Sequence, residues 1–166
     1  MEKSNIVLIG MPGSGKSTVG KTLAGIMKRK FIDTDLLIKE AEGRELKDIV
    51  AKEGREAFLN IQEKIILKLN TANSVIATGG SVVYSPLSMS HLKKDGVIVY
   101  LKNKFELLIE RAGADRRFAR NENQSLQDMF DERNPLYEKY ADIIIDCSER
   151  GPVELAKEII DIISVK

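Results

Sequence analysis

Residues 10–18 read Gly-Met-Pro-Gly-Ser-Gly-Lys-Ser-Thr, which matches the complete phosphate-loop pattern G-x-x-x-x-G-K-S/T. A mostly β-branched apolar run at residues 5–9 precedes the motif, and apolar residues recur at helical spacing over residues 16–28. The motif binds nucleotide phosphates when it lies between a strand and a helix in this way. The chain therefore begins as an α/β unit with a nucleotide site at its first turn.

The residue types of this loop explain how it would hold phosphate. Glycines let consecutive backbone N–H groups turn toward an anion, and the N-terminus of the following helix adds positive potential. Lys16 can reach the β- and γ-phosphates, and Ser17 offers a hydroxyl to Mg²⁺. A glycine-rich turn that binds nothing is the alternative, which the Lys-Ser pair in this context disfavours. We expect the nucleoside triphosphate to contact Gly13, Ser14, Gly15, Lys16, Ser17 and Thr18.

The rest of the chain alternates between short apolar runs and longer stretches of helical periodicity. Further strands are expected at residues 31–33, 74–77, 97–101 and 143–145. Helices are expected at about 35–41, 45–52, 55–70, 104–112, 125–140 and 152–164. This alternation predicts an α/β fold of three α/β/α layers, the P-loop NTPase arrangement, with a parallel sheet between helices.

Two acidic residues are candidates for a magnesium site beside the loop. Asp33 and Asp146 each follow a predicted strand, and Mg²⁺ in such sites takes one or two carboxylates together with substrate phosphates. Asp33 comes directly after the first crossover helix, so its strand is expected near the loop. Asp146 reads better as a cap or loop acid. We therefore assign the metal to Ser17 and Asp33.

Composition narrows the classes of partner. The chain has 26 Lys and Arg against 25 Asp and Glu, so its net charge of +1 provides no general attraction for nucleic acid. A single cysteine, Cys147, excludes a disulfide within the chain and a multi-cysteine metal site. No apolar run approaches the ~18 residues that a membrane helix needs. We expect one cytoplasmic, monomeric domain over residues 1–166, without nucleic-acid or membrane partners.

The sequence also indicates which class of nucleotide-dependent enzyme this chain resembles more, a GTPase or a small-molecule kinase. A GTPase would need Asn-Lys-x-Asp to read guanine, and Lys102-Asn103-Lys104-Phe105 lacks the acid. A small-molecule kinase needs an ATP site, an acceptor pocket and a lid that excludes water. The polar stretch at about 113–124 carries Arg116, Arg117 and Arg120 without periodicity, which is typical of a mobile lid.

Five segments, in this order, resemble the shikimate kinase family over essentially the whole chain. They are residues 10–18, the Asp-Thr-Asp at 33–35, the Thr-Gly-Gly at 78–80, the arginine-bearing loop and the Arg-Asn-Pro-Leu-Tyr at 133–137. The resemblance implies a five-stranded parallel sheet with a lid, substrate-binding helices at about 35–70, and transfer of phosphate from ATP, with Mg²⁺, to a ring hydroxyl of shikimate.

The resemblance also implies residue roles. Asp35 would orient or deprotonate the acceptor hydroxyl, although it could equally cap a helix beginning at Leu36. Gly79 and Gly80 would let the backbone approach the substrate ring, or form a plain turn. Arg133 would bind the substrate carboxylate, or pair with a neighbouring acid on the surface of its helix.

Two further arginines follow from the same resemblance. Arg116 is the best match to the catalytic arginine of the lid, with Arg117 as the next candidate. Arg111 matches the position that lies against the adenine of ATP.

The chain departs from the family pattern at Leu59 and Ser81. The family usually has a carboxylate-binding arginine where Leu59 stands, and we expect Leu59 to face the pocket as an apolar wall. The family commonly has a third glycine at the position of Ser81. Both changes concern the acceptor, so two alternatives to a shikimate kinase stay open. One is a related kinase for another small hydroxylated metabolite, and the other is a non-catalytic ATP-binding module.

Overall fold

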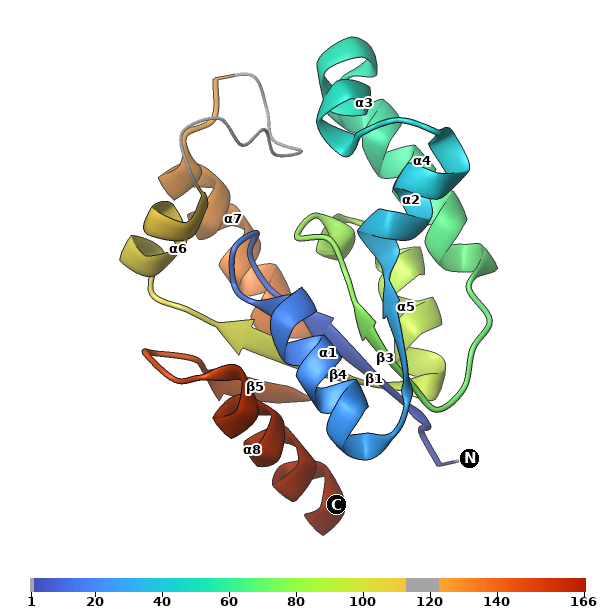
Figure 1. The fold of residues 1–166 in the computed structure, drawn as a ribbon. Coiled ribbons are helices and arrows are strands. Elements are labelled where there is room, and N and C mark those ends of the chain that lie inside the picture. The colour runs from blue at the N-terminus through green and yellow to red at the C-terminus, as the bar shows by residue number, and fades with distance from the viewer. Residues whose placement is uncertain (1, 113–122) are drawn as a thin grey trace.

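The computed structural model describes residues 2–112 and 123–166 (Figure 1). Within this part of the chain, a five-stranded sheet has the order β2-β3-β1-β4-β5, and every neighbouring pair is parallel. The strands are β1 (Asn5–Ile9), β2 (Lys30–Asp33), β3 (Ser74–Ala77), β4 (Gly96–Lys102) and β5 (Ile143–Asp146). The α/β prediction is confirmed, and each predicted strand is found within one residue of its expected bounds.

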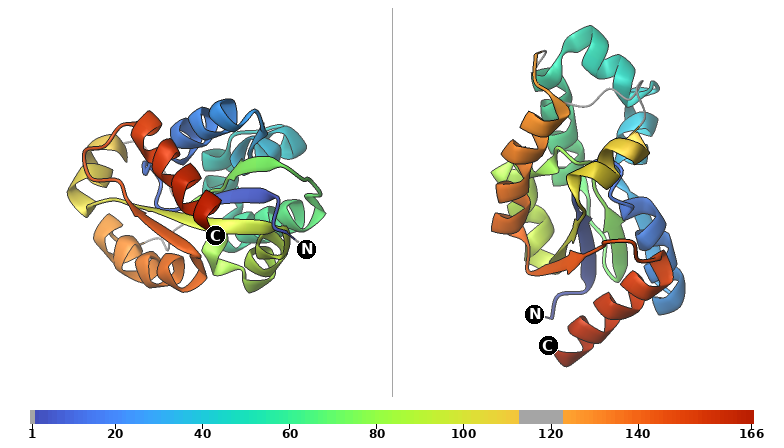
Figure 2. Two further views of the ribbon diagram at one scale, coloured as in Figure 1. Left: turned by 90° about the horizontal axis from the view of Figure 1, so that it is seen from below. Right: turned by 90° about the vertical axis from the view of Figure 1, so that its left-hand side faces the viewer.

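Helices cover both faces of the sheet, as the views from below and from the side show (Figure 2). On one face, α1 (Lys16–Met27) and α8 (Pro152–Val165) pack against alternate residues of β1 such as Ile6 and Leu8. On the other face, α4 (Arg55–Lys68), α5 (Pro86–Asp95) and α7 (Leu126–Tyr140) pack against Val7 and Ile9. Because side chains alternate along a strand, the unbroken apolar run of β1 supplies both cores.

Two helical segments beside the sheet were not among the helices predicted from the sequence. Ser85 caps the start of α5, where its hydroxyl accepts from the Ser88 N–H at 3.0 Å. Pro86 follows as the first residue of the helix. This Ser-Pro pair is a recognisable start signal, but the short helix lacks a strong apolar period. A single 3₁₀ turn, Val82–Tyr84, leads into it and buries two valines.

The remaining helices lie beyond the carboxyl ends of the strands (Figure 1). The helices α2 (Thr34–Glu42) and α3 (Leu46–Glu53) pack with α4 around a separate small core of Ile38, Ile49 and Phe58. The helix α6 (Phe105–Ala112) follows β4. No helix within residues 2–112 and 123–166 has both the length and the apolar character needed to span a membrane.

Two glycines of α1 provide a test of this packing. A Cβ on Gly25 would meet nothing within 4 Å, so Gly25→Ala should raise the free energy of unfolding by about 0.5–1 kcal/mol. A Cβ on Gly20 would lie 2.7 Å from the Phe31 ring and 3.3 Å from Leu8, so Gly20→Ala should lower it. Urea denaturation of both variants measures the difference. A rise in stability for Gly20→Ala would contradict the close packing of α1 on the sheet.

Candidate active site

A cavity of about 490 Å³ lies beyond the carboxyl ends of the strands, between the 10–18 loop and the helices α2 to α4. Open parallel sheets bind their ligands at this end. The cavity brings together predicted residues that are far apart in the sequence: Gly13, Gly15, Lys16, Ser17, Thr18, Asp33, Asp35, Gly79, Gly80 and Arg133.

The 10–18 loop has the conformation that a phosphate cradle requires. Gly13 and Gly15 have φ of +81° and +92°, a left-handed region that other residues rarely adopt. Gly15 is followed directly by α1, whose first N–H groups have no acceptors within the helix. The Lys16 ammonium is held at the loop, donating to the carbonyls of Gly10 at 2.7 Å and Met11 at 2.8 Å. Backbone donors and one cation therefore converge where an anion would bind.

Ser17 and Asp33 meet at one side of this loop. The Ser17 hydroxyl donates to Oδ2 of Asp33 at 2.9 Å. The contact is formed although β2, which ends at Asp33, is separated from β1 by β3. Both residues offer the hard oxygen ligands that suit Mg²⁺, and the described residues contain no cluster of three or more His, Cys, Asp or Glu side chains that could hold a metal alone. An ion here would take its other ligands from phosphates and water.

The alternative acid, Asp146, lies at the opposite edge of the sheet on β5. Its Oδ1 accepts from the Ser148 hydroxyl at 2.6 Å and from the Ser148 N–H at 3.1 Å. These hydrogen bonds lower the pKa of the Asp146 carboxyl. Asp146 therefore ends β5 and holds the turn that follows, and it is not among the residues that line the cavity.

Asp35 belongs to the first turn of α2 and lines the cavity. The alternative in which Asp35 caps a helix beginning at Leu36 is wrong, because α2 begins at Thr34. Asp33 is the cap, and its Oδ1 accepts from the Asp35 N–H at 3.0 Å. The cap leaves the Asp35 carboxylate on the cavity side of the helix.

Gly79 and Gly80 follow β3 where other side chains already occupy the space. A Cβ on Gly79 would lie 2.6 Å from Oδ1 of Asp35. A Cβ on Gly80 would lie 2.7 Å from Cδ of Pro12 and 3.0 Å from Nη1 of Arg133. A larger residue here would therefore displace the protein's own side chains, a reason for glycine beyond the substrate approach or plain turn that the sequence suggested.

Arg133 is only 1% exposed, so the alternative of a surface arginine on α7 is wrong. Its Nε donates to the Tyr84 hydroxyl at 3.2 Å, and the guanidinium carbon lies 5.2 Å from the centre of the Tyr84 ring. Burial raises the pKa of Tyr84, so this hydroxyl stays neutral beside the arginine. Arg133 is thus a fixed, buried cation on the cavity wall.

Gln62 lies behind the cavity residues Gly79 and Ser81, and the sequence did not reveal this position. It is 3% exposed on α4, between the buried Phe58 and Ile66 one turn away on either side. Its Oε1 accepts from the Ser81 hydroxyl at 3.0 Å, so Ser81 is bonded within the protein. Its Nε2 has no partner among the described residues and lies 2.9 Å from where a Cβ on Gly79 would stand. A polar residue on the buried stripe of a helix was the available signal.

Leu59 does not line the cavity. It is half-buried against the small core of Ile38, Ile49 and Phe58. The apolar wall expected of Leu59 is instead formed by Leu46, Val50 and Phe58.

A second cavity of about 340 Å³ lies across the 10–18 loop and includes Gly13, Arg111, Cys147 and Pro152 in its lining. Arg111 donates to the Gly13 carbonyl at 3.3 Å, which places it beside the loop as a nucleotide contact requires.

Cys147 is buried, and burial raises the pKa of its thiol to about 11. The thiol therefore stays protonated and packs as a small apolar residue. Arg116, Arg117 and Arg120 lie outside the described residues.

Comparison with known proteins adds a family to this geometry. The model of a family described as shikimate kinase matches residues 12–164. The chain is similar to the shikimate kinase of Histophilus somni strain 2336, with 37% identity over 98% of this chain and 96% of that protein.

Solved structures agree with the sequence relatives. A shikimate kinase from Acinetobacter baumannii in complex with shikimate has a TM-score of 0.90 and 33% identity, covering 98% of this chain and 93% of that one. The shikimate kinase of Aquifex aeolicus has a TM-score of 0.80 and 30% identity, covering 96% of each chain.

The metal assignment can be tested on nucleotide binding alone. Asp33→Asn removes a charge beside Ser17 but keeps an oxygen that can accept from the Asp35 N–H. It should raise the Kd for ATP in the presence of Mg²⁺ by about 10-fold and leave the Kd in EDTA nearly unchanged. Asp146→Asn is the matched control and should change neither value. A loss confined to Asp146→Asn would contradict the assignment.

Proposed function

The chain belongs to the shikimate kinase family, and from this premise we propose that it transfers the γ-phosphoryl group of ATP to a hydroxyl of shikimate, forming shikimate 3-phosphate. One observation carries the proposal: the phosphate loop, the Asp35 carboxylate and the buried Arg133 line the same cavity. A phosphate donor, an acceptor hydroxyl and an acceptor carboxylate would each find a matching group there.

The transfer needs a positioned hydroxyl more than covalent help from the protein. Asp35 would accept the hydrogen bond of the acceptor hydroxyl and then its proton. The hydroxyl oxygen forms a bond to the γ-phosphorus while the bond from that phosphorus to the bridging oxygen of ADP breaks. Lys16 and the backbone N–H groups of the loop would stabilise the charge that accumulates on the phosphate oxygens.

Ser17 and Asp33 would hold Mg²⁺, which would neutralise charge on the β- and γ-phosphates. Arg111 would lie at the nucleotide across the loop, and its position in the second cavity supports that role. Arg116, with Arg117 next, stays the predicted catalytic arginine of the lid at about 113–124. The expected monomeric state and cytoplasmic location also stay predictions.

The acceptor would lie between polar and apolar walls. Arg133 would bind its carboxylate through charge-assisted hydrogen bonds, because the guanidinium is held by Tyr84 at the cavity wall. Leu46, Val50 and Phe58 would pack against the carbon ring. Gly79 and Gly80 would leave the space that the Asp35 and Arg133 side chains occupy at the end of β3.

A second candidate is a related kinase for another small hydroxy acid. It is favoured by the acceptor side of the cavity, where Ser81 lines the wall and bonds to Gln62, and where position 59 carries no arginine. The residues proposed to bind ATP are the same for both candidate functions.

ADP release with Mg²⁺-ATP tests the two candidates directly. We expect release that depends on shikimate and stops when EDTA removes the metal. Turnover with quinate or another hydroxy acid, but none with shikimate, would favour the second candidate. Measurable ATP binding without turnover on any acceptor would indicate a non-catalytic ATP-binding module.

Gly79→Ala tests the geometry around Asp35. The added Cβ would stand 2.6 Å from Oδ1 of Asp35, so the carboxylate must move, and a displacement of this kind lowers kcat by about 100-fold. The Kd for ATP should stay near its original value, because the 10–18 loop is untouched. Gly25→Ala, far from the cavity, is the control for replacing a glycine. Unchanged kcat in Gly79→Ala would show that Asp35 does not act from this position.

A further inference from the structure

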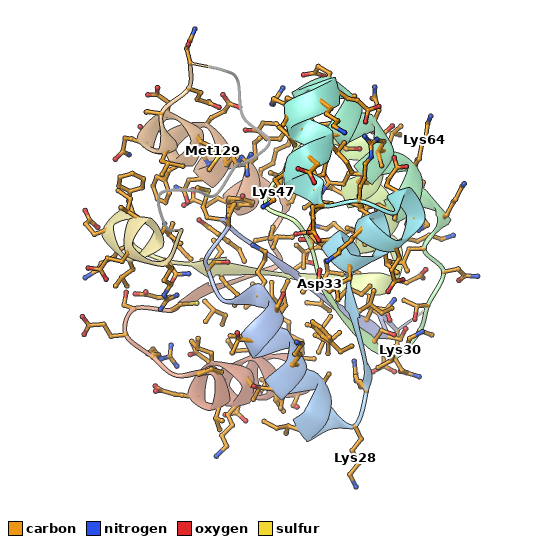
Figure 3. All side chains as sticks on the ribbon, turned by 45° about the horizontal axis from the view of Figure 1, so that its top comes forward. Lys28, Lys30, Asp33, Lys47, Lys64 and Met129 are labelled. Atoms are coloured by element: carbon orange, nitrogen blue, oxygen red, sulfur yellow. The ribbon has the colours of Figure 1, made fainter. Side chains whose placement is uncertain are left out.

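A lysine that no sequence motif identifies, Lys47, lines the cavity from α3. Figure 3 shows its side chain extending from α3 toward the cavity, whereas Lys64 on α4 points outward. Its neighbours Leu46 and Val50 line the same wall. Lys47 therefore lies on the side of the cavity proposed for the acceptor.

Three other charged groups of the cavity have identified side-chain contacts. Lys16 is bonded to the loop carbonyls, and Asp33 to Ser17. Glu45 accepts from Lys39 at 2.7 Å, and this hydrogen bond lowers the pKa of Glu45. Among residues 2–112 and 123–166, no carboxylate lies within ion-pair distance of Lys47. Its ammonium can therefore turn to an anion in the cavity without breaking an ion pair with any of these residues.

We propose that Lys47 and Arg133 together bind the carboxylate of the acceptor, and this inference rests on the proposed function. Arg133 is a buried, fixed guanidinium on α7, whereas Lys47 carries a compact charge on a flexible four-carbon stem. The fixed group sets the orientation of the acid, and the flexible one adds attraction from α3. Two cations that line one cavity from different helices would select a small hydroxy acid over a neutral polyol.

The position of Leu59 supports the proposal that Lys47 and Arg133 bind the carboxylate together. Leu59 packs into the small core and lies off the cavity, so α4 contributes no cation to the acceptor. The charge comes instead from the preceding helix of the same three-helix unit. Lys47 is then a specificity-determining residue of the acceptor side of the cavity.

Lys47→Met tests the inference, with Lys64→Met as a matched control. Lys47 is exposed, so a methionine of similar length should leave the fold intact, which the urea transition checks. We expect the KM for shikimate to rise about 10- to 100-fold in Lys47→Met, the range for loss of one charged hydrogen bond. The KM for ATP and kcat should each change by less than about 3-fold, because the contact is to the acceptor in both ground and transition states.

The methyl ester of shikimate adds a readout that a general structural defect would not produce. Lys47→Met should lower the preference for the acid over the ester, while Lys47→Arg and Lys64→Met should preserve it. Shikimate turnover with an unchanged KM in Lys47→Met would overturn the role of Lys47 alone. A rise in the KM for ATP instead would place Lys47 on the nucleotide and also overturn it. Absence of turnover in the unaltered protein would contradict the proposed function itself.

Discussion

The Asp33 carboxylate couples the two halves of the cavity, because its two oxygens bond to different helices. Oδ2 accepts from Ser17 at the start of α1, and Oδ1 accepts from the N–H of Asp35 in the first turn of α2. One side chain at the end of β2 therefore contacts both the proposed metal-binding hydroxyl and the helix turn that carries the proposed proton acceptor. A shift of either helix would strain both contacts, so the nucleotide and acceptor sides share a single anchor.

Close packing at the end of β3 is the complementary constraint. Gly79 and Gly80 leave room that is filled by Asp35, Gln62, Pro12 and Arg133. The Tyr137 hydroxyl donates to the Gly80 carbonyl at 2.6 Å, which ties α7 to the same turn. Lys16 and Arg133 are thus held at the cavity by contacts with backbone carbonyls and a tyrosine, without a bound ligand. Such a preorganised arrangement lowers the cost of ordering the site when substrates bind.

The overall charge of the chain says little about this site. A net charge of +1 hides a cavity in which Lys16, Lys47 and Arg133 face Asp33 and Asp35. Lys16, Asp33 and Asp35 were predictable, because the loop motif and the acids after β2 are contiguous signals. Lys47 and Gln62 were not, because nothing in the local sequence says which face of α3 or α4 turns toward a cavity. Leu59 shows the same difficulty, since it was expected to face the pocket and instead packs against the small core.

The sequence by itself determined the strand–loop–helix unit at residues 5–27 and the alternation of strands and helices, because these depend on local backbone preference and apolar period. It also determined the family, whose motifs are spread over the whole chain. Only the tertiary structure decided that Asp33 reaches Ser17 from a strand that does not neighbour β1, that Arg133 is buried, and that Lys47 enters the cavity while Leu59 does not. Those outcomes depend on the strand order and on how three short helices pack, and such long-range contacts leave no local pattern in the sequence.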